Sequence, residues 1–287
     1  MDEYGCHLPQ IMYQKPCLFL HLRKRSFYLS VALTAFTTFT VLLGKRALSA
    51  LHVMENVETK LEERWGKLVP NPSASTWWQK LKSKYSEHGR YYHSLYHLQD
   101  MFHHFDQEKD KIKSQESVQL AIFFHDMVYD PKAGDNEEQS ADMFLEFAKT
   151  HMSGKEDTVK NVKEYILITK THLTEAHQDE KIFGTDDLHY FLDMDMAVLG
   201  WPQNEYQCYS KGIRQEYIHI PEEKYRVGRA AVLKSFLERK NIYATKEFRE
   251  KFEKRARSNV EQEIRNLEDP KFNIEGLPGV RQELCTH

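Results

Sequence analysis

The dipeptide His125-Asp126 is the first place in this sequence where residue types indicate chemistry. It ends the apolar run 118–124, which is typical of a buried helix. Burying an imidazole or a carboxylate costs free energy unless another group pairs with it. A metal ion would pair with both, so a metal site at this helix end is the first hypothesis.

Two further residues could complete a metal site around the dipeptide. His97 lies upstream and Asp195 downstream, each within another predicted helix. Two imidazoles and two carboxylates from separate helices suit a divalent ion such as Mn, Fe, Co, Ni, Mg or Zn, with positions left for water and substrate. Water acidified by such an ion is a nucleophile at neutral pH, so the set indicates hydrolytic chemistry.

The elements that must position these residues are predicted to be helices. Apolar residues recur at helical spacing from about residue 57 to residue 268, and no alternating strand pattern, phosphate-binding glycine loop or internal repeat accompanies them. We therefore expect one all-α domain over 57–268, followed by a tail over 269–287. The expected helices cover 57–68, about 76–85, about 91–105, 114–126, 136–148, 158–172, 187–199, 203–218, 222–239 and 245–267. In the third of these helices, His93 and His97 are four residues apart and would share one face.

Composition places the chemistry in one part of the chain. The 40 Lys and Arg residues nearly balance the 43 Asp and Glu residues, so no basic surface predicts a nucleic-acid partner. Four cysteines at no metal-ligand spacing favour a reducing compartment. Eight of the 15 histidines fall between residues 93 and 177, which is where we expect the site.

An apolar segment precedes the predicted domain. Residues 26–44 carry no charged side chain, and basic residues flank them at 23–25 and 45–46. Serine and threonine dilute the segment, and its length lies at the lower end of what spans a bilayer. It could be a membrane anchor, a signal-peptide core, an unstructured extension or a soluble apolar helix. We expect a cytoplasmic protein with an N-terminal extension over 1–56; membrane anchoring through 26–44 is the alternative.

The ordered set His97, His125-Asp126 and Asp195 resembles that of the HD superfamily of metal-dependent phosphohydrolases. Longer runs around it are similar to an uncharacterised branch of predicted HD phosphohydrolases, over about residues 57–267. These runs are Arg90–Leu98, Phe123–Pro131, Asn136–Ala141, Thr169–His172, Phe191–Gly200, Ile213–Tyr217 and Ala256–Asn259.

The resemblance implies a single HD-type helical domain that holds a divalent metal through His97, His125, Asp126 and Asp195. It also implies hydrolysis of a phosphate ester or anhydride, with a nucleotide as the expected small-molecule substrate. It does not separate phosphomonoesterase from phosphodiesterase or pyrophosphohydrolase activity. Asp195 is preferred to Asp193 because the family's terminal aspartate precedes an apolar or basic residue and a short run to glycine. Asp193 would then have a supporting or capping role.

His93 is similar to the first histidine of the pair that opens the motif of cyclic-nucleotide phosphodiesterases. In those enzymes the first histidine protonates the leaving oxygen and the second, here His97, binds metal. General acid is the resulting hypothesis for His93, and a histidine on a helix surface is the alternative. Tyr129-Asp130 stands where the alarmone-hydrolysing branch has a Glu-Asp pair, which argues against that activity.

Other residues have both a functional and a structural interpretation. His172 could bind a second metal or a substrate phosphate, or be a histidine favoured by the dipole at a helix C-terminus. Glu137 could activate water, or stabilise the first turn of a helix together with Glu138. Arg90 and Lys170 could contact phosphate, or form ion pairs. Three more arginines share that interpretation: Arg214, Arg229 and Arg257.

Two other functions are compatible with the sequence. A catalytically inactive, metal-containing module that binds or senses nucleotides would keep the same ligands. A membrane-anchored scaffold would depend on 26–44 alone.

Overall fold

The computed structural model describes residues 56–70 and 74–276, which all lie in one compact unit of the chain, Ala50–His287. Within these ranges the regular secondary structure is helical and contains no β-strand, so the expected all-α class is confirmed. The apolar segment 26–44 lies outside the described residues. No helix within 56–70 and 74–276 combines the length and hydrophobicity that a bilayer-spanning helix needs.

The observed helices follow the apolar spacing of the sequence closely. Residues 56–68 form the first of them. The others are α2 (Ala74–Tyr85), α3 (Leu95–Glu108), α4 (Gln115–Phe124), α5 (Asn136–His151), α6 (Glu156–Ile168), α7 (Glu175–Gln178), α8 (Asp187–Met196), α9 (Gln203–Glu216), α10 (Glu222–Glu238), α11 (Lys246–Phe248) and α12 (Lys254–Glu268). Short 3₁₀ segments are η1 (Lys109–Lys111), η2 (Ala197–Gly200) and η4 (Ile274–Gly276), and η3 (Arg249–Glu253) is a π-helical segment between α11 and α12.

Two boundaries differ from expectation near the candidate site. Helix α3 begins at Leu95 with Ser94 as its N-cap, so His93 precedes the helix and the prediction of a helical face shared with His97 is wrong. Helix α6 ends at Ile168, so His172 lies beyond it rather than in its last turn. Tertiary contacts described below hold both histidines in non-helical backbone.

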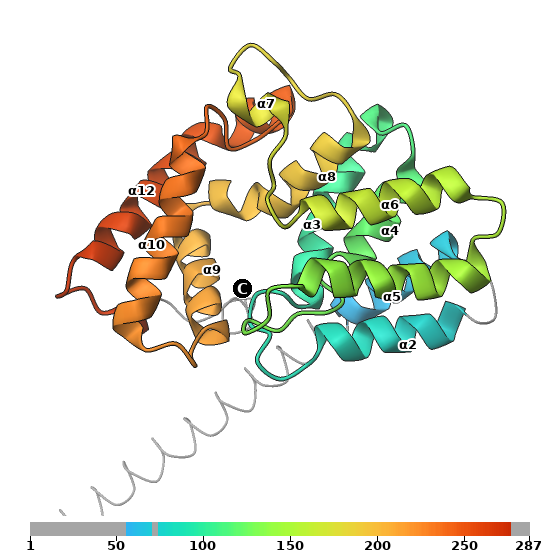
Figure 1. Ribbon diagram of the computed structural model, residues 1–287, viewed down its shortest axis with the longest axis horizontal. Helices are drawn as coiled ribbons and strands as arrows, with labels where there is room; N and C mark the ends of the chain where they lie inside the picture. Colours follow the sequence, from blue (N-terminus) through green and yellow to red (C-terminus); the bar gives the residue numbers. More distant parts are fainter. Residues whose placement is uncertain (1–55, 71–73, 277–287) are drawn as a thin grey trace, which may run out of the picture. The chain divides into compact units, whose positions relative to one another are not determined.

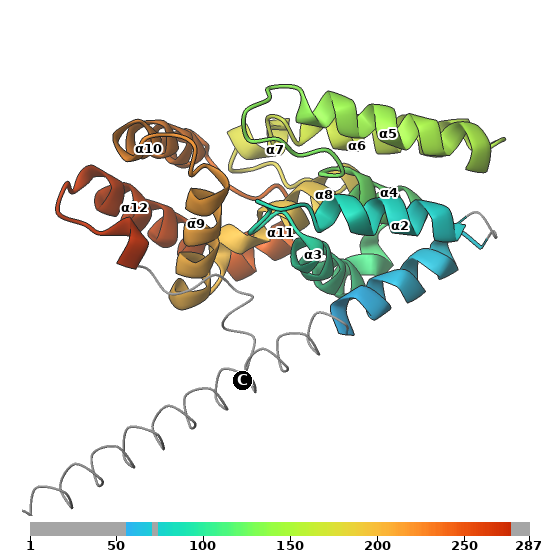
Figure 2. The same ribbon diagram turned by 90° about the horizontal axis from the view of Figure 1, so that it is seen from below.

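The helices of the described unit pack in two groups joined by α8 and η2. Helices α3, α4, α5 and α6 pack against one another, and α9 and α10 pack against α12. Helix α8 contacts α3, α4 and α6, while η2, which continues from it, contacts α9 and α12. Figures 1 and 2 both show α9, α10 and α12 together on one side of α8, and α2, α4 and α5 on the other.

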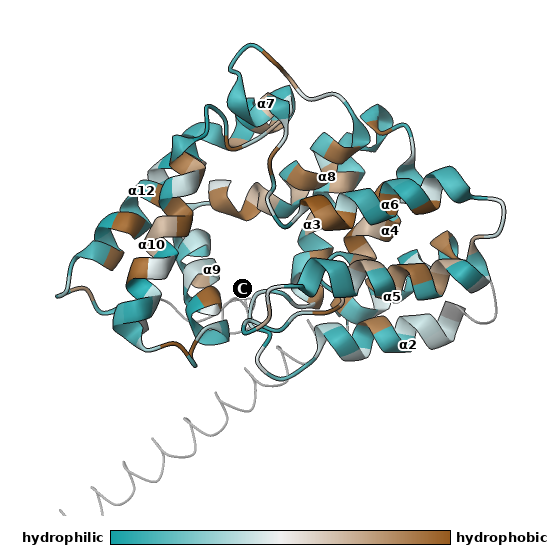
Figure 3. Cartoon of the chain, in the orientation of Figure 1, coloured by the Kyte–Doolittle hydropathy of each residue, from teal (hydrophilic) through white to brown (hydrophobic). Residues whose placement is uncertain are grey.

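Helix α4 is buried on all sides over its last five residues, 120–124, which explains the apolar sequence there. The rings of Phe123 and Trp65 are 5.1 Å apart, and those of Phe124 and Phe147 are 5.3 Å apart, so aromatic contacts hold the last turn of α4 on two sides. Outward-facing positions of the surrounding α5 and α6 are polar (Figure 3). This packing fixes the position of the helix end that carries His125.

His104 provides a pH-dependent test of the packing between α3 and η3. Its side chain lies 5.6 Å from the ring of Phe248 and 5.5 Å from that of Phe252, and burial, with Lys251 and His103 nearby, lowers its pKa to about 4. Between pH 6.5 and 4 the unfolded chain therefore binds a proton that the folded chain does not. Stability should fall as pH falls through this window, by up to about 3 kcal/mol.

We expect His104→Leu to flatten the pH dependence of the free energy of unfolding between pH 6.5 and 4, as measured by urea denaturation. The control is His88→Leu, because His88 is exposed. Parallel curves for the wild type and His104→Leu would contradict the assignment.

Candidate metal centre

Three helices bring the predicted ligands together. His97 on α3, His125 at the C-cap of α4 and Asp195 on α8 offer ligand atoms that all lie within 4.8 Å of one another. Nε2 of His97 is 3.0 Å from Oδ1 of Asp195 and 3.1 Å from Nε2 of His125. Both histidine side chains are almost fully buried. This buried group could hold a metal ion.

Asp126 lies at the edge of the same group. Its Oδ2 is 3.1 Å from Nε2 of His125 and 3.8 Å from Nε2 of His97. The side chain is 20% exposed, compared with 1% for His125, so Asp126 faces the accessible side of the cluster. The four predicted ligands therefore converge, and we refer to His97, His125, Asp126 and Asp195 as the four-residue cluster.

The donor atoms of the cluster fit a divalent ion. Nδ1 of His125 lies 3.0 Å from the carbonyl oxygen of Ile122, to which it would donate a hydrogen bond. This assignment leaves the lone pair of Nε2 directed at the other ligand atoms. If two ligand atoms each lie about 2.1 Å from an ion and subtend a right angle there, about 3.0 Å separates them. The shorter distances between ligand atoms in the cluster are close to this value.

Electrostatics also require positive charge at the cluster. Burial opposes protonation of His125, but Asp126 and Asp195 outweigh this effect and raise its pKa to about 9. Burial would raise the pKa values of the two aspartates, yet the neighbouring histidines hold both below their usual range. Burial lowers the pKa of His97. A proton shared among these groups, or a cation in its place, satisfies the two carboxylates.

The structure separates Asp195 from Asp193. The carboxylate of Asp193 accepts hydrogen bonds from the backbone N–H groups of Ala244 and Thr245, both at 2.7 Å, and from the Thr245 hydroxyl at 2.6 Å. Residues two apart on a helix point in different directions, so Asp193 holds the segment before α11 while Asp195 reaches the cluster.

Exchange of each aspartate for asparagine should separate metal binding from stability. We expect Asp195→Asn to lose bound metal and Asp193→Asn to keep it. The second variant should lose about 1–3 kcal/mol of stability, because buried donors lose their charged acceptor. Elemental analysis and thermal denaturation measure the two effects, and full metal content in Asp195→Asn would contradict the ligand assignment.

His172 reaches the cluster through an unusual backbone conformation. Its φ of 47° lies in the left-handed region, which non-glycine residues seldom adopt. Arg239 donates hydrogen bonds to the carbonyl oxygens of His172 at 2.6 Å and Thr171 at 2.9 Å. Nε2 of His172 then lies 2.7 Å from Oδ2 of Asp195. The histidine is thus a neighbour of the four-residue cluster, held by a contact from α10.

Lys170 and Glu137 meet where the loop before α5 approaches the end of α6. Nζ of Lys170 is 4.0 Å from Glu137, 2.6 Å from Glu138 and 2.8 Å from the carbonyl oxygen of Gly134. The lysine side chain is 42% exposed. Both predicted roles, water activation for Glu137 and phosphate contact for Lys170, stay predictions.

Arg90 supports the backbone around the site. Its guanidinium donates hydrogen bonds to the carbonyl oxygens of His93 at 3.3 Å, Asp126 at 2.6 Å and Met127 at 3.0 Å. The other candidate arginines also have partners within the protein. Arg214 donates to nearby carbonyl oxygens, and Arg229 contacts Glu263 and Tyr209. Arg257 donates to Glu253 and to three carbonyl oxygens.

Two residues to which the sequence assigned no role at the site, Glu216 and Tyr129, contact His93. Its Nδ1 is 2.7 Å from Oε2 of Glu216, and its ring stacks on Tyr129 at 4.2 Å. The centroids of the His93 and His97 rings are 6.0 Å apart, so His93 borders the cluster. A sequence signal for Glu216 exists, because it occupies the stripe of α9 that also contains the buried Tyr206 and Ile213.

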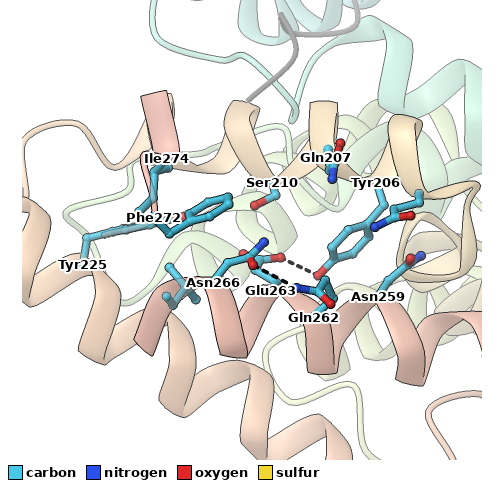
Figure 4. A pocket seen from close by; sticks show the side chains of 12 residues that line it. Tyr206, Gln207, Ser210, Tyr225, Asn259, Gln262, Glu263, Asn266, Phe272 and Ile274 are labelled. Carbon is cyan, nitrogen blue, oxygen red and sulfur yellow. Dashed lines mark hydrogen bonds between the residues drawn. The ribbon is translucent and has the colours of Figure 1, made fainter. Parts of the chain in front are cut away.

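A small cavity between α9, α10 and α12 is separate from the cluster (Figure 4). Its volume of about 30 Å³ suits one or two water molecules. Tyr206 and Glu263, which are hydrogen-bonded to each other, lie on its wall, and none of its lining residues belongs to the four-residue cluster.

Comparison of the chain with protein-family models, with curated proteins and with solved structures finds no match.

Proposed function

We propose that this protein is a metal-dependent phosphohydrolase. The observation that carries the proposal is the group formed by His97, His125 and Asp195, with Asp126 beside His125. These residues follow one another along the chain in the order that resembles the ligand set of the HD superfamily. Such a group does not stabilise the fold by packing alone, because desolvating its imidazoles and carboxylates costs free energy. Metal binding gives it a function.

The four side chains would hold the ion, and their unequal exposure gives the site a direction. Asp126 is 20% exposed and His97 2%, so substrate approaches from the side of Asp126. When bound, a divalent ion supplies a Lewis acid that lowers the pKa of water and offsets the charge of a phosphoryl group.

His93 borders this accessible side and would act as the general acid. Its side chain is 20% exposed, and its Nδ1 is engaged by Glu216, which leaves Nε2 to deliver a proton to the leaving oxygen. Burial opposes protonation of His93, but the charge of Glu216 outweighs it and raises the pKa of the imidazole. A raised pKa favours the protonated imidazole, which suits the departure of an alkoxide.

The substrate class that follows is a phosphate ester or anhydride, and a nucleotide is the substrate that the resemblance favours. His172, which contacts Asp195, could add positive charge opposite phosphate, and Lys170 is the lysine that the sequence predicts to contact phosphate.

We expect Lys170→Ala to raise KM more than it lowers kcat, because an exposed lysine that contacts phosphate contributes to binding rather than to the chemical step. Steady-state kinetics with the best substrate found would measure the two constants, and a loss confined to kcat would contradict a role in binding.

The direct test combines metal analysis with a substrate screen. Purified protein loaded with Mn, Co, Ni or Mg should hydrolyse at least one member of a panel of nucleotides and other phosphate esters. We expect the double variant His125→Ala with Asp126→Ala to lose bound metal and to lower turnover to the uncatalysed level. The exposed His103, one turn and a half from His97 on α3, gives the matched control His103→Ala.

Two outcomes would count against the proposal. Undiminished hydrolysis by the double variant would mean that another site does the chemistry. Nucleotides that raise the melting temperature without turnover would favour the binding or sensing module.

A further inference from the structure

Glu216 is a fully buried carboxylate whose hydrogen bonds all lead toward His93. It ends α9, and its side chain is 0% exposed. Its Oε1 accepts hydrogen bonds from three consecutive backbone N–H groups, those of Tyr91 at 2.8 Å, Tyr92 at 2.7 Å and His93 at 3.0 Å. These bonds explain why the chain before Leu95 is not helical, because its N–H groups point at a side chain from α9.

The second oxygen of Glu216 binds two side chains. Oε2 accepts from Nδ1 of His93 at 2.7 Å and from the Tyr129 hydroxyl at 2.9 Å. The Tyr129 ring also stacks on the imidazole, with centroids 4.2 Å apart and planes at 29°. His93 is therefore held at one edge by Glu216 and on one face by Tyr129.

This arrangement determines which nitrogen of His93 carries a proton. An ionised carboxylate can only accept hydrogen bonds, so the short contact requires hydrogen on Nδ1. Five donors surround the carboxylate, and with the charge of His93 they lower its pKa although burial would raise it. If Glu216 served only the backbone, one oxygen would be enough; the second is engaged by the imidazole and by the ring that stacks on it.

We propose that Glu216 is a positioning residue that fixes the tautomer and orientation of His93, so that Nε2 faces the four-residue cluster. This inference builds on the proposed function. In the reaction, a water oxygen bonds to phosphorus, and the bond to the leaving oxygen breaks with its electron pair on that oxygen. The Nε2 proton of His93 transfers to the leaving oxygen, Nδ1–H stays on Glu216, and solvent takes up the proton of the attacking water and later restores the one on Nε2.

The first test uses leaving groups of different basicity. In Glu216→Gln the side-chain oxygen can still accept from the backbone, but an amide NH₂ directed at Nδ1 would favour the other tautomer. We expect kcat for an alkyl phosphate, such as a nucleoside monophosphate, to fall about 100-fold with little change in KM. With p-nitrophenyl phosphate, whose leaving group departs without a proton, kcat should change less than about threefold. Tyr129→Phe keeps the stacked ring and should show a smaller effect of the same kind.

The matched control is Glu263→Gln. Glu263 is also a buried glutamate with a tyrosine hydroxyl partner, Tyr206, but it lies on α12. We expect this variant to lose stability without any dependence on the leaving group. Equal losses for both substrates in Glu216→Gln would show a structural role only, and would overturn the proposal.

The second test needs no turnover. ¹⁵N NMR of histidine-labelled, metal-free protein should show the Nδ1–H form of neutral His93, assigned by its absence in His93→Gln. We expect Glu216→Gln to shift it to the Nε2–H form, and an unchanged tautomer would overturn the proposal. Because the spectrum is independent of hydrolysis, a tautomer shift in a protein that hydrolyses nothing supports the role of Glu216 while the proposed function fails.

Discussion

Two partly buried carboxylates beside two buried histidines need a compensating positive charge, and the candidate site is built around that need. Asp126 and Asp195 lie against the buried side chains of His97 and His125, and Asp126 faces the accessible side. In such surroundings an unpaired charge costs several kcal/mol, so the cluster is stable only with a proton or a cation among its members. The helices that carry these residues are held from outside by aromatic contacts around α4. The convergence is therefore imposed by the fold rather than by attraction among the four side chains.

Charged side chains around the cluster share one structural device. Arg90, Arg239, Asp193 and Glu216 each bind consecutive or neighbouring backbone groups of a non-helical segment. These segments lie beside the candidate site: the turn before α3, the chain after α4, the end of α6 and the start of α11. Irregular backbone next to a buried site leaves N–H and C=O groups without helical partners, and a charged side chain satisfies several at once.

Two of these contacts also link helices outside the cluster to the turns that present site residues. Glu216 joins the end of α9 to the turn that presents His93, and Arg239 joins α10 to the turn that presents His172. Helices α9 and α10 belong to the group that packs with α12, whereas the cluster is built mostly from the other group. The second group of helices thus contributes to the proposed site through positioning contacts, not through cluster residues.

The sequence by itself determined the helical class and most helix positions, and it singled out His97, His125 and Asp126. Apolar spacing is a local property, so it located α5 at Asn136, α9 at Gln203 and α10 at Glu222 before any contact was known. The cost of burying His125-Asp126 is also evident from the local sequence, so it indicated the site. Only the tertiary structure decided that Asp195 reaches the cluster while Asp193 caps a loop, that His93 precedes α3, and that His172 adopts a left-handed conformation. Each of these depends on a partner far away in the chain, such as Glu216 for His93 or Thr245 for Asp193, and periodicity within one segment carries no information about such partners.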